Sequence, residues 1–164
     1  MRSHSRLLHD ASLLNALEAK CGLTPTPLRY LMEHSAKLFV SRAEERGQLV
    51  GCITAVFVPP AHTELRVLSL GVSEQARSRR IGRHLVKRAI RKAHEAGCEL
   101  VTMECRPSNK AVQRLAESVG GRLAKTKPGY YPDGEDALVY VLRLQKGEQD
   151  GVQGKEAEGK GQVG

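Results

Sequence analysis

The chain has 164 residues, a formal net charge of +8, 40% hydrophobic residues and few aromatic ones: four Tyr, two Phe and no Trp. This is the length of about one domain, whose core must be filled by aliphatic side chains. The longest apolar runs are too short to span a bilayer, and the polar start MRSHSR lacks the apolar region of a secretory signal, so we expect a cytoplasmic protein without a membrane partner.

The four cysteines, Cys21, Cys52, Cys98 and Cys105, form no C-x-x-C pair and have no neighbouring His at ligand spacing. We therefore expect reduced thiols that are mostly buried, with no metal site and no disulfide framework. The positive net charge favours an anionic partner, which is a nucleic acid, a membrane surface or a phosphorylated cofactor.

The first predicted elements along the chain are helices. DASLLNALEAKCG begins at a capping Asp10 and ends at Gly22, with its leucines on one stripe. A second helix is expected after Pro27, in PLRYLMEHSAKL, because Pro is tolerated in the first turn. Both helices are expected to cover a sheet.

Strands are predicted next. KLFVSRAEERGQ indicates a strand and a turn, LVGCITAVFV is rich in β-branched and aliphatic residues and ends at Pro59, and ELRVLSLGV alternates before a polar turn. After that turn, apolar residues recur at helical spacing from Ile81 to Ala93, and cations occupy the other face. This pattern predicts an amphipathic helix that stops at Gly97.

The last third of the chain predicts a strand in CELVTMEC, a helix in SNKAVQRLAESVGG with Ser108 as its N-cap, and two more strands in RLAKT and ALVYVLRL. The element order indicates a single α/β domain with a central mixed β-sheet flanked by helices. From Gln145 onward the residues are rich in Gly and charge, with almost nothing apolar. We therefore expect the domain to span residues 1–144 and residues 145–164 to form a disordered tail.

The stretch from Arg77 to Lys92 contains eight Lys or Arg and no Asp or Glu, and it begins where a strand leads into the amphipathic helix. A helix N-terminus presents backbone N–H groups and the positive end of the helix dipole, and small residues there let a phosphate approach the main chain. The segment RSRRIG therefore predicts phosphate binding at this turn.

Here the sequence resembles the coenzyme A signature of the GNAT superfamily of N-acetyltransferases, whose pattern is Q/R-x-x-G-x-G/A. The strand LSLGV followed by ARSRRIGRHL is similar to it from Arg77, with Arg80 in the place of the first Gly and Gly82 in that of the second. Arg80 is compatible with the pattern if its backbone lies in the helical region rather than at positive φ.

Two later segments resemble the RimI-like branch, which contains ribosomal-protein-alanine and related protein N-terminal acetyltransferases. MECRPSNKAVQRL is similar to its L-E-V-R-x-S-N segment, and KPGYYPDGEDALVYVL to its tyrosine-rich hairpin and last strand. The resemblance covers roughly residues 10–144. It implies the GNAT fold and an acyltransferase that uses acetyl-CoA.

The resemblance also implies the residues that hold acetyl-CoA. The strand before the turn would pair with the pantetheine arm through its backbone, the N–H groups of the turn would hold the pyrophosphate, and an Asn after the next strand would contact the cofactor. In this sequence they are Leu70, Gly71 and Val72 on the strand, Arg77, Ser78, Arg79, Arg80, Ile81, Gly82 and Arg83 in the turn, and Asn109. Without the resemblance, Asn109 is a plain first-turn helix residue beside the Ser108 cap.

Glu104 matches the carboxylate to which the family assigns the role of general base. A carboxylate can take the proton of an attacking amine, directly or through a water, if burial moves its pKa toward neutrality. The alternative is a strand-end carboxylate that is paired with Arg106 or exposed. Tyr130 and Tyr131 match the aromatic pair that shapes the peptide entrance, and their alternative is packing of the hairpin against the N-terminal helices.

One departure from the family bears on the reaction. The family's helix R-L-Y-E-x-x-G-F carries a Tyr that protonates the leaving thiolate, whereas RLAESVGG has Ala116 in that place and Gly121 in place of the aromatic residue. General acid catalysis contributes about 10²- to 10⁴-fold, but a thiol with a pKa of about 8.5 leaves tolerably well as a thiolate. We therefore expect a reduced rate rather than a complete loss.

The later helix cations are Lys87, Arg88, Arg91 and Lys92, which lie more than a turn past the phosphate site. Charge on one helical face is commonplace, so a solvated face is the simpler interpretation. No aromatic residues interleave with the basic ones to stack on bases, which argues against nucleic acid as a partner.

The sequence thus predicts an acetyltransferase that acts on a primary amine, with the α-amine of a protein N-terminus as the favoured acceptor and a ribosomal protein as one candidate. One alternative is a lysine side chain or a small amine as acceptor. Another is a noncatalytic acyl-CoA-binding module, which Ala116 and Arg80 favour.

Overall fold

The computed structural model describes residues 12, 15–16, 18–19 and 37–145 of the chain. The strands are β1 (Leu38–Glu45), β2 (Gln48–Phe57), β3 (Glu64–Val72), β4 (Leu100–Cys105), β5 (Arg122–Lys127) and β6 (Ala137–Arg143). The helices are α3 (Ile81–Glu95), α4 (Lys110–Ser118) and the short 3₁₀ helix η1 (Glu74–Ala76). Their order agrees with the order expected from the sequence, except that η1 was not foreseen.

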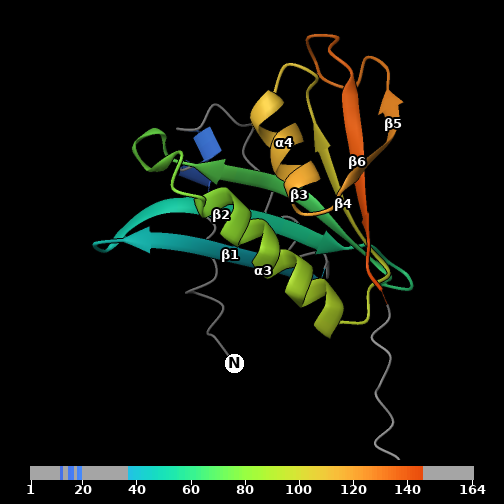
Figure 1. Ribbon diagram of the computed structural model, residues 1–164, viewed down its shortest axis with the longest axis horizontal. Coiled ribbons are helices and arrows are strands. Elements are labelled where there is room, and N and C mark those ends of the chain that lie inside the picture. The colour runs from blue at the N-terminus through green and yellow to red at the C-terminus, as the bar shows by residue number, and fades with distance from the viewer. Residues whose placement is uncertain (1–11, 13–14, 17, 20–36, 146–164) are drawn as a thin grey trace, which may run out of the picture.

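All six strands form one sheet in the order β1-β2-β3-β4-β6-β5 (Figure 1). Every neighbouring pair is antiparallel except β3 and β4, which are parallel because α3 crosses over between them. The parallel pairing runs from Glu64 opposite Leu100 to Val67 opposite Met103. Beyond Val67, the rest of β3 has no partner on β4, so the two strands separate there.

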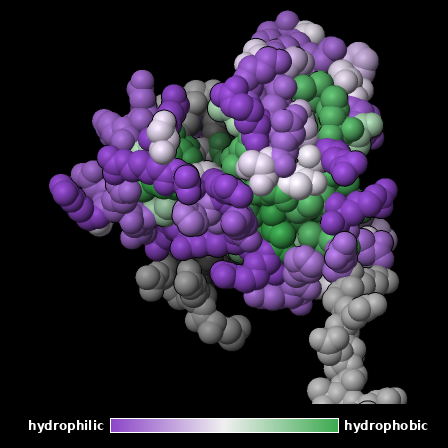
Figure 2. Space-filling view, viewed as in Figure 1, coloured by the Kyte–Doolittle hydropathy of each residue, from purple (hydrophilic) through white to green (hydrophobic). Residues whose placement is uncertain are grey.

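Helix α3 is amphipathic, as predicted, and packs on β1, β2 and β3. Its buried residues are Leu85, Val86, Ala89 and Ala93, whereas Figure 2 shows that its outward face is hydrophilic. The helix lies close to β2 at Gly51, where a Cβ atom would be 2.9 Å from Ile81 Cγ2 and 3.2 Å from Leu85 Cδ1. A glycine at this position therefore lets the start of α3 rest directly on the sheet.

Helix α4 packs on β4 and begins one residue later than the expected Ser108 cap implies. Asn109 is the N-cap, because its Oδ1 accepts a hydrogen bond from the Val112 N–H at 3.2 Å. The Ser108 N–H instead donates to Glu135 Oε1 at 3.0 Å. The expectation that Ser108 caps this helix is therefore wrong.

Several expectations fall partly or wholly outside the described residues. Of the predicted N-terminal helices, only residues 12, 15–16 and 18–19 are described, and all of them are helical. The predicted tail is outside the described ranges from residue 146 onward. Cys52, Cys98 and Cys105 are buried and form no disulfide with one another, as expected, and Cys21 is not among the described residues. No helix in the described part of the chain is long and apolar enough to cross a membrane.

We predict that Leu85→Ala lowers the free energy of unfolding by about 2–5 kcal/mol, because it removes a buried side chain from the contact between α3 and the sheet. Urea denaturation measures this change. Lys87→Ala, on the exposed face of the same helix, is the matched control and should change stability by no more than about 0.5 kcal/mol. Equal effects of the two substitutions would contradict the assigned faces of α3.

Candidate active site

The separation of β3 and β4 opens a groove of about 240 Å³ in the sheet. It is lined by Leu68 and Ser69 of β3, by Met103 and Glu104 of β4, and by Tyr131. The Ser69 hydroxyl is buried without a hydrogen-bond partner among the described residues. Ligands of α/β sheets commonly bind where parallel strands end, and an unsatisfied buried hydroxyl at such a point suits a polar ligand group.

A second groove of about 670 Å³ lies between the end of β3, the turn before α3 and the start of α4. Its lining contains all the residues expected to hold acetyl-CoA except Arg79: Leu70, Gly71, Val72, Arg77, Ser78, Arg80, Ile81, Gly82, Arg83 and Asn109. Leu70, Asn109 and Val112 also line the opening between β3 and β4, so the two grooves are continuous.

The second groove is positively charged. Arg77 Nε donates to the Val72 carbonyl at 3.5 Å, and Arg83 Nη2 donates to the Ser118 carbonyl at 3.4 Å. In the described part of the chain no carboxylate forms an ion pair with Arg77, Arg80 or Arg83. Three cationic side chains are thus available to an anionic ligand in this groove.

The Arg79 side chain behaves differently from its neighbours. Its Nη1 forms an ion pair with Glu45 Oε2 at 2.7 Å. Arg79 lines a separate groove beside the β1–β2 turn. Only its backbone therefore belongs to the turn that precedes α3.

Arg80 adopts the left-handed conformation, with φ 61° and ψ 14°, and α3 begins at the next residue. The sequence made Arg80 acceptable on the condition that it avoided positive φ, and the structure does not meet that condition. Glycine adopts this conformation at least cost, so the backbone here has the shape that the family's usual Gly would take. Within the described part of the chain, no side chain caps the start of α3, so its first N–H groups have no side-chain acceptor there.

Glu104 lies on β4 opposite Val139, with 17% of its side chain exposed. Its carboxylate accepts a hydrogen bond from the Lys127 ammonium, and the nearby Tyr130 hydroxyl also stabilises its ionised form. Burial raises the pKa of Glu104, but these interactions and the charges of Lys127 and Arg66 together outweigh it, so the pKa lies below its ordinary value. The condition that burial moves this pKa toward neutrality is not met.

The two hairpin tyrosines lie edge to face, with ring centroids 5.2 Å apart and an interplanar angle of 89°. Tyr131 lines the opening between the strands, and the Arg106 guanidinium lies 3.9 Å from its ring centroid. Tyr130 is 49% exposed, and Lys127 Nζ lies 4.9 Å from its ring centroid. Tyr131 thus forms part of one wall of the opening, and Tyr130 packs against Tyr131 beside Glu104.

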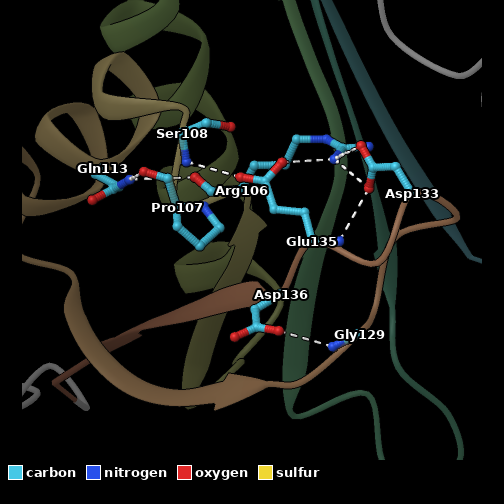
Figure 3. A network of polar contacts seen from close by, with 8 residues as sticks. All are labelled: Arg106, Pro107, Ser108, Gln113, Gly129, Asp133, Glu135 and Asp136. Atoms are coloured by element: carbon cyan, nitrogen blue, oxygen red, sulfur yellow. Dashed lines mark hydrogen bonds and ion pairs between the residues drawn. The ribbon is translucent and has the colours of Figure 1, made fainter.

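A polar network holds this wall in place (Figure 3). Arg106 Nη1 lies 2.8 Å from both Asp133 Oδ2 and Glu135 Oε2. Hydrogen bonds from Ser108 and Arg106 lower the pKa of Glu135, so it stays ionised. The network joins the segment after β4 to the loop between β5 and β6. The alternative pairing of Glu104 with Arg106 is therefore wrong, because Arg106 pairs with the hairpin acids and Glu104 with Lys127.

Ala116, in the place of the family's Tyr, is completely buried on the inner side of α4. Gly121 donates its N–H to the Ala116 carbonyl at 2.9 Å, and a Cβ atom at Gly121 would lie 2.9 Å from that same oxygen. With the backbone in this conformation, position 121 has no room for an aromatic side chain. The described residues offer no phenol at position 116 to protonate a leaving group.

Sequence reasoning missed Lys127 as a contact of Glu104. Its only signal was its position directly after the predicted strand RLAKT, three residues before the tyrosine pair. The later helix cations are exposed, as expected for a solvated face. Arg88 also donates to Ser41 Oγ at 3.3 Å and to the Arg42 carbonyl at 3.1 Å, which attaches α3 to β1.

Among the residues described here, no group of three or more His, Cys, Asp or Glu is placed to hold a metal ion.

Comparison with known proteins identifies the family. The model described as "Acetyltransferase (GNAT) family" matches residues 11–120. The N-alpha-acetyltransferase MAK3 of Arabidopsis thaliana is 36% identical over 105 residues, which cover 63% of this chain and 55% of that protein. The N-alpha-acetyltransferase 30 of Xenopus laevis is 38% identical over 78 residues, which cover 48% of this chain and 29% of that protein. The chain thus spans about half or less of the length of these relatives.

Among solved structures, the ribosomal-protein-S18-alanine N-acetyltransferase from Escherichia coli is similar, with a TM-score of 0.73. The sequence identity is 21%, and the match covers 87% of this chain and 92% of that chain. At this identity the likeness shows the fold. The predicted mixed sheet flanked by helices is thus confirmed as the GNAT arrangement.

We predict that Arg80→Gly leaves the stability of the chain unchanged or raises it by up to about 1 kcal/mol. The substitution removes the strain of a side chain at positive φ. The free energy gained in this way equals or exceeds the extra entropic cost of ordering a Gly, which is more flexible in the unfolded chain. Arg83→Gly, in the first turn of α3, is the control and should destabilise by about 1 kcal/mol. Thermal unfolding compares the two, and equal losses of stability would contradict the left-handed turn.

We predict that Lys127→Met raises the pKa of Glu104, because it removes a hydrogen bond and a positive charge from the carboxylate. An NMR titration of the Glu104 carboxyl carbon measures this shift. Lys125→Met, two residues earlier on the same strand, should leave the pKa unchanged. An unchanged value in both variants would contradict the contact between Lys127 and Glu104.

The same substitution should alter stability against pH. Because the pKa of Glu104 is lower in the folded chain, its ionised form stabilises the fold at any pH above its pKa in the unfolded chain, near 4.5. This contribution is lost as the pH falls through the pKa of the folded chain. Lys127→Met should therefore lose less stability on acidification than the unchanged chain, which urea denaturation at a series of pH values would show.

Proposed function

Because the chain belongs to the acetyltransferase (GNAT) family, we propose that it transfers an acetyl group from acetyl-CoA to the α-amine of a protein N-terminus. The observation that carries the proposal is the junction of two grooves at Leu70, Asn109 and Val112, beside the groove that holds Glu104. One groove is long and positively charged, and the other ends at a carboxylate beside two tyrosines. The names of the relatives, which are N-alpha-acetyltransferases, support the choice of acceptor.

The positively charged groove suits the phosphates and the pantetheine arm of acetyl-CoA. Arg77, Arg80 and Arg83 supply positive charge, and the first N–H groups of α3 add the dipole of a helix N-terminus. Beyond Val67, the edge of β3 that faces β4 has no strand partner among the described residues, so its backbone can pair with the amides of the arm.

Glu104 would receive the proton of the acceptor amine. The amine nitrogen attacks the thioester carbonyl carbon, the carbon–sulfur bond breaks, the thiolate leaves, and the proton passes to Glu104 and then to solvent. Because its pKa is lowered, Glu104 is ionised at neutral pH and is a weak base, which suits a carboxylate that holds an ammonium group and passes its proton on. The step requires no metal and no covalent enzyme intermediate.

Tyr130 and Tyr131 would shape the entrance for the acceptor peptide. Rigid aromatic side chains give large contact area at a low entropic cost, and the ion pairs of Arg106 keep the hairpin that carries them in place. A ribosomal protein is one candidate acceptor. The three buried free thiols suit the reducing conditions of the cytoplasm, which is the location we propose.

A second candidate is a noncatalytic acyl-CoA-binding module. The buried Ala116 in the place of a general acid and the lowered pKa of Glu104 both favour it. A third keeps the chemistry but uses a lysine side chain or a small amine as acceptor. These candidates differ in which amines release thiol from acetyl-CoA.

We predict that Glu104→Gln lowers the turnover of N-terminal peptides by about 10²- to 10⁴-fold, because the base is lost. Thiol release from acetyl-CoA with a panel of peptides measures this change, and calorimetry should show unchanged CoA affinity. Glu95→Gln, at the exposed end of α3, is the matched control and should keep full turnover.

The same assay separates the candidates. Turnover with free amines but not with peptides would replace the N-terminal acceptor with a small amine. CoA binding without turnover on any amine would favour the noncatalytic module. Absence of CoA binding would overturn all three.

A further inference from the structure

A primary amine of the chain already contacts the group that would take the acceptor's proton. The Lys127 ammonium donates a hydrogen bond to Glu104 Oε1, and Glu104 lines the opening that continues into the positively charged groove. An acceptor amine must reach this same carboxylate. The Lys127 amine therefore already contacts the carboxylate that an acceptor amine would use.

We propose that Lys127 is itself an acetylation site, which the chain modifies with its own acetyl-CoA. The inference rests on the proposed function, because it uses the same donor and the same base. It assigns to Lys127 a covalent modification that is distinct from the acetylation of a peptide acceptor.

The placement of Lys127 limits where its amine can go. It is the last residue of β5 and pairs with Ala137 of β6, so its side chain starts at the sheet edge and extends across to Glu104 on β4. The Tyr130 ring lies 4.9 Å from Nζ on the hairpin side. Only 34% of the Lys127 side chain is exposed. The amine is thus held against the carboxylate rather than extended into solvent.

Lys125 provides a contrast on the same strand. It pairs with Val139 and lies two residues before Lys127, so the alternation of a strand places both side chains on one face of the sheet. It is exposed, and it forms no ion pair with a carboxylate among the described residues. The two lysines share strand and face but differ in their contact with Glu104.

The reaction is balanced with the donor alone. The ammonium gives one proton to Glu104, the neutral Nζ attacks the thioester carbonyl carbon, and the carbon–sulfur bond breaks to release the CoA thiolate. The nitrogen loses its second proton as the amide forms, and the thiolate takes up one proton. The products are Nε-acetyl-lysine and free CoA.

Acetylation would change Glu104 as well as Lys127. A neutral amide replaces the ammonium, so the carboxylate loses its closest positive charge and becomes available to the ammonium of an incoming peptide. The pKa of Glu104 should rise as well, because Lys127 is one of the groups that lower it. Self-acetylation would therefore prepare the site for peptide acceptors.

The experiment incubates the full chain with acetyl-CoA that carries an isotopically heavy acetyl group and follows each lysine by peptide mass spectrometry. We expect Lys127 to gain heavy acetyl at least about tenfold faster than Lys125, because only Lys127 contacts a base. Light acetyl on Lys127 but not on Lys125 in the purified chain counts as the same result. The rate should not change over a tenfold dilution of the chain, as an intramolecular step requires.

Two variants test the role of the contact. Glu104→Gln should reduce labelling of Lys127 to the rate of Lys125, and Lys127→Arg should abolish labelling at that position while thermal unfolding shows that it remains folded. Equal labelling of Lys127 and Lys125, labelling of Lys127 that survives Glu104→Gln, or a rate proportional to chain concentration would overturn the inference.

A CoA titration by calorimetry separates this failure from that of the proposed function. If the chain binds CoA and acetylates peptides but leaves Lys127 free of both heavy and light acetyl, only the self-acetylation of Lys127 is overturned. If the chain does not bind CoA, both proposals are overturned.

Discussion

The candidate site depends on the point at which β3 and β4 stop pairing. Four residue pairs hold the two parallel strands together from Glu64 and Leu100 onward, and beyond Val67 and Met103 the sheet is open. Each strand continues past this point paired with its other neighbour, so both strands stay in the sheet while β3 and β4 no longer pair with each other. Both grooves, the exposed edge of β3 and the position of Glu104 follow from this separation.

The charge of Glu104 shows how the surroundings of a carboxylate decide its chemistry. Burial alone would make it a better base, yet Lys127, Tyr130 and Arg66 all stabilise its ionised form. The result is a carboxylate that is ionised at neutral pH and in contact with the Lys127 ammonium. Such a group is well suited to recognising an ammonium ion, whether that ion comes from the chain itself or from an acceptor.

Much of the fold could be predicted from the sequence, because apolar residues recur at strand or helix spacing and this spacing indicates which side chains are buried. Leu65 on β3, Leu85 on α3 and Val101 on β4 are examples. The family resemblance led us to expect most of the residues that line the positively charged groove, because those from Leu70 to Arg83 lie close together along the chain, whereas Asn109 comes from the start of α4. The N-cap of α4 was misjudged, since Ser108 and Asn109 are equally good caps and the choice depends on Glu135, a residue far along the chain. The contact between Lys127 and Glu104 was not predictable for the same reason, because it crosses the sheet between strands that are not neighbours.

The width of the positively charged groove depends on how closely the start of α3 packs on β2. Ile81 is both a wall of this groove and the residue whose methyl group rests over Gly51 of β2. A Cβ atom at position 51 would lie 2.9 Å from Ile81 Cγ2, so Ile81 or the first turn of the helix would have to move. The space in the positively charged groove thus depends on the absence of a Cβ atom at Gly51, a residue of β2 that does not itself line the groove.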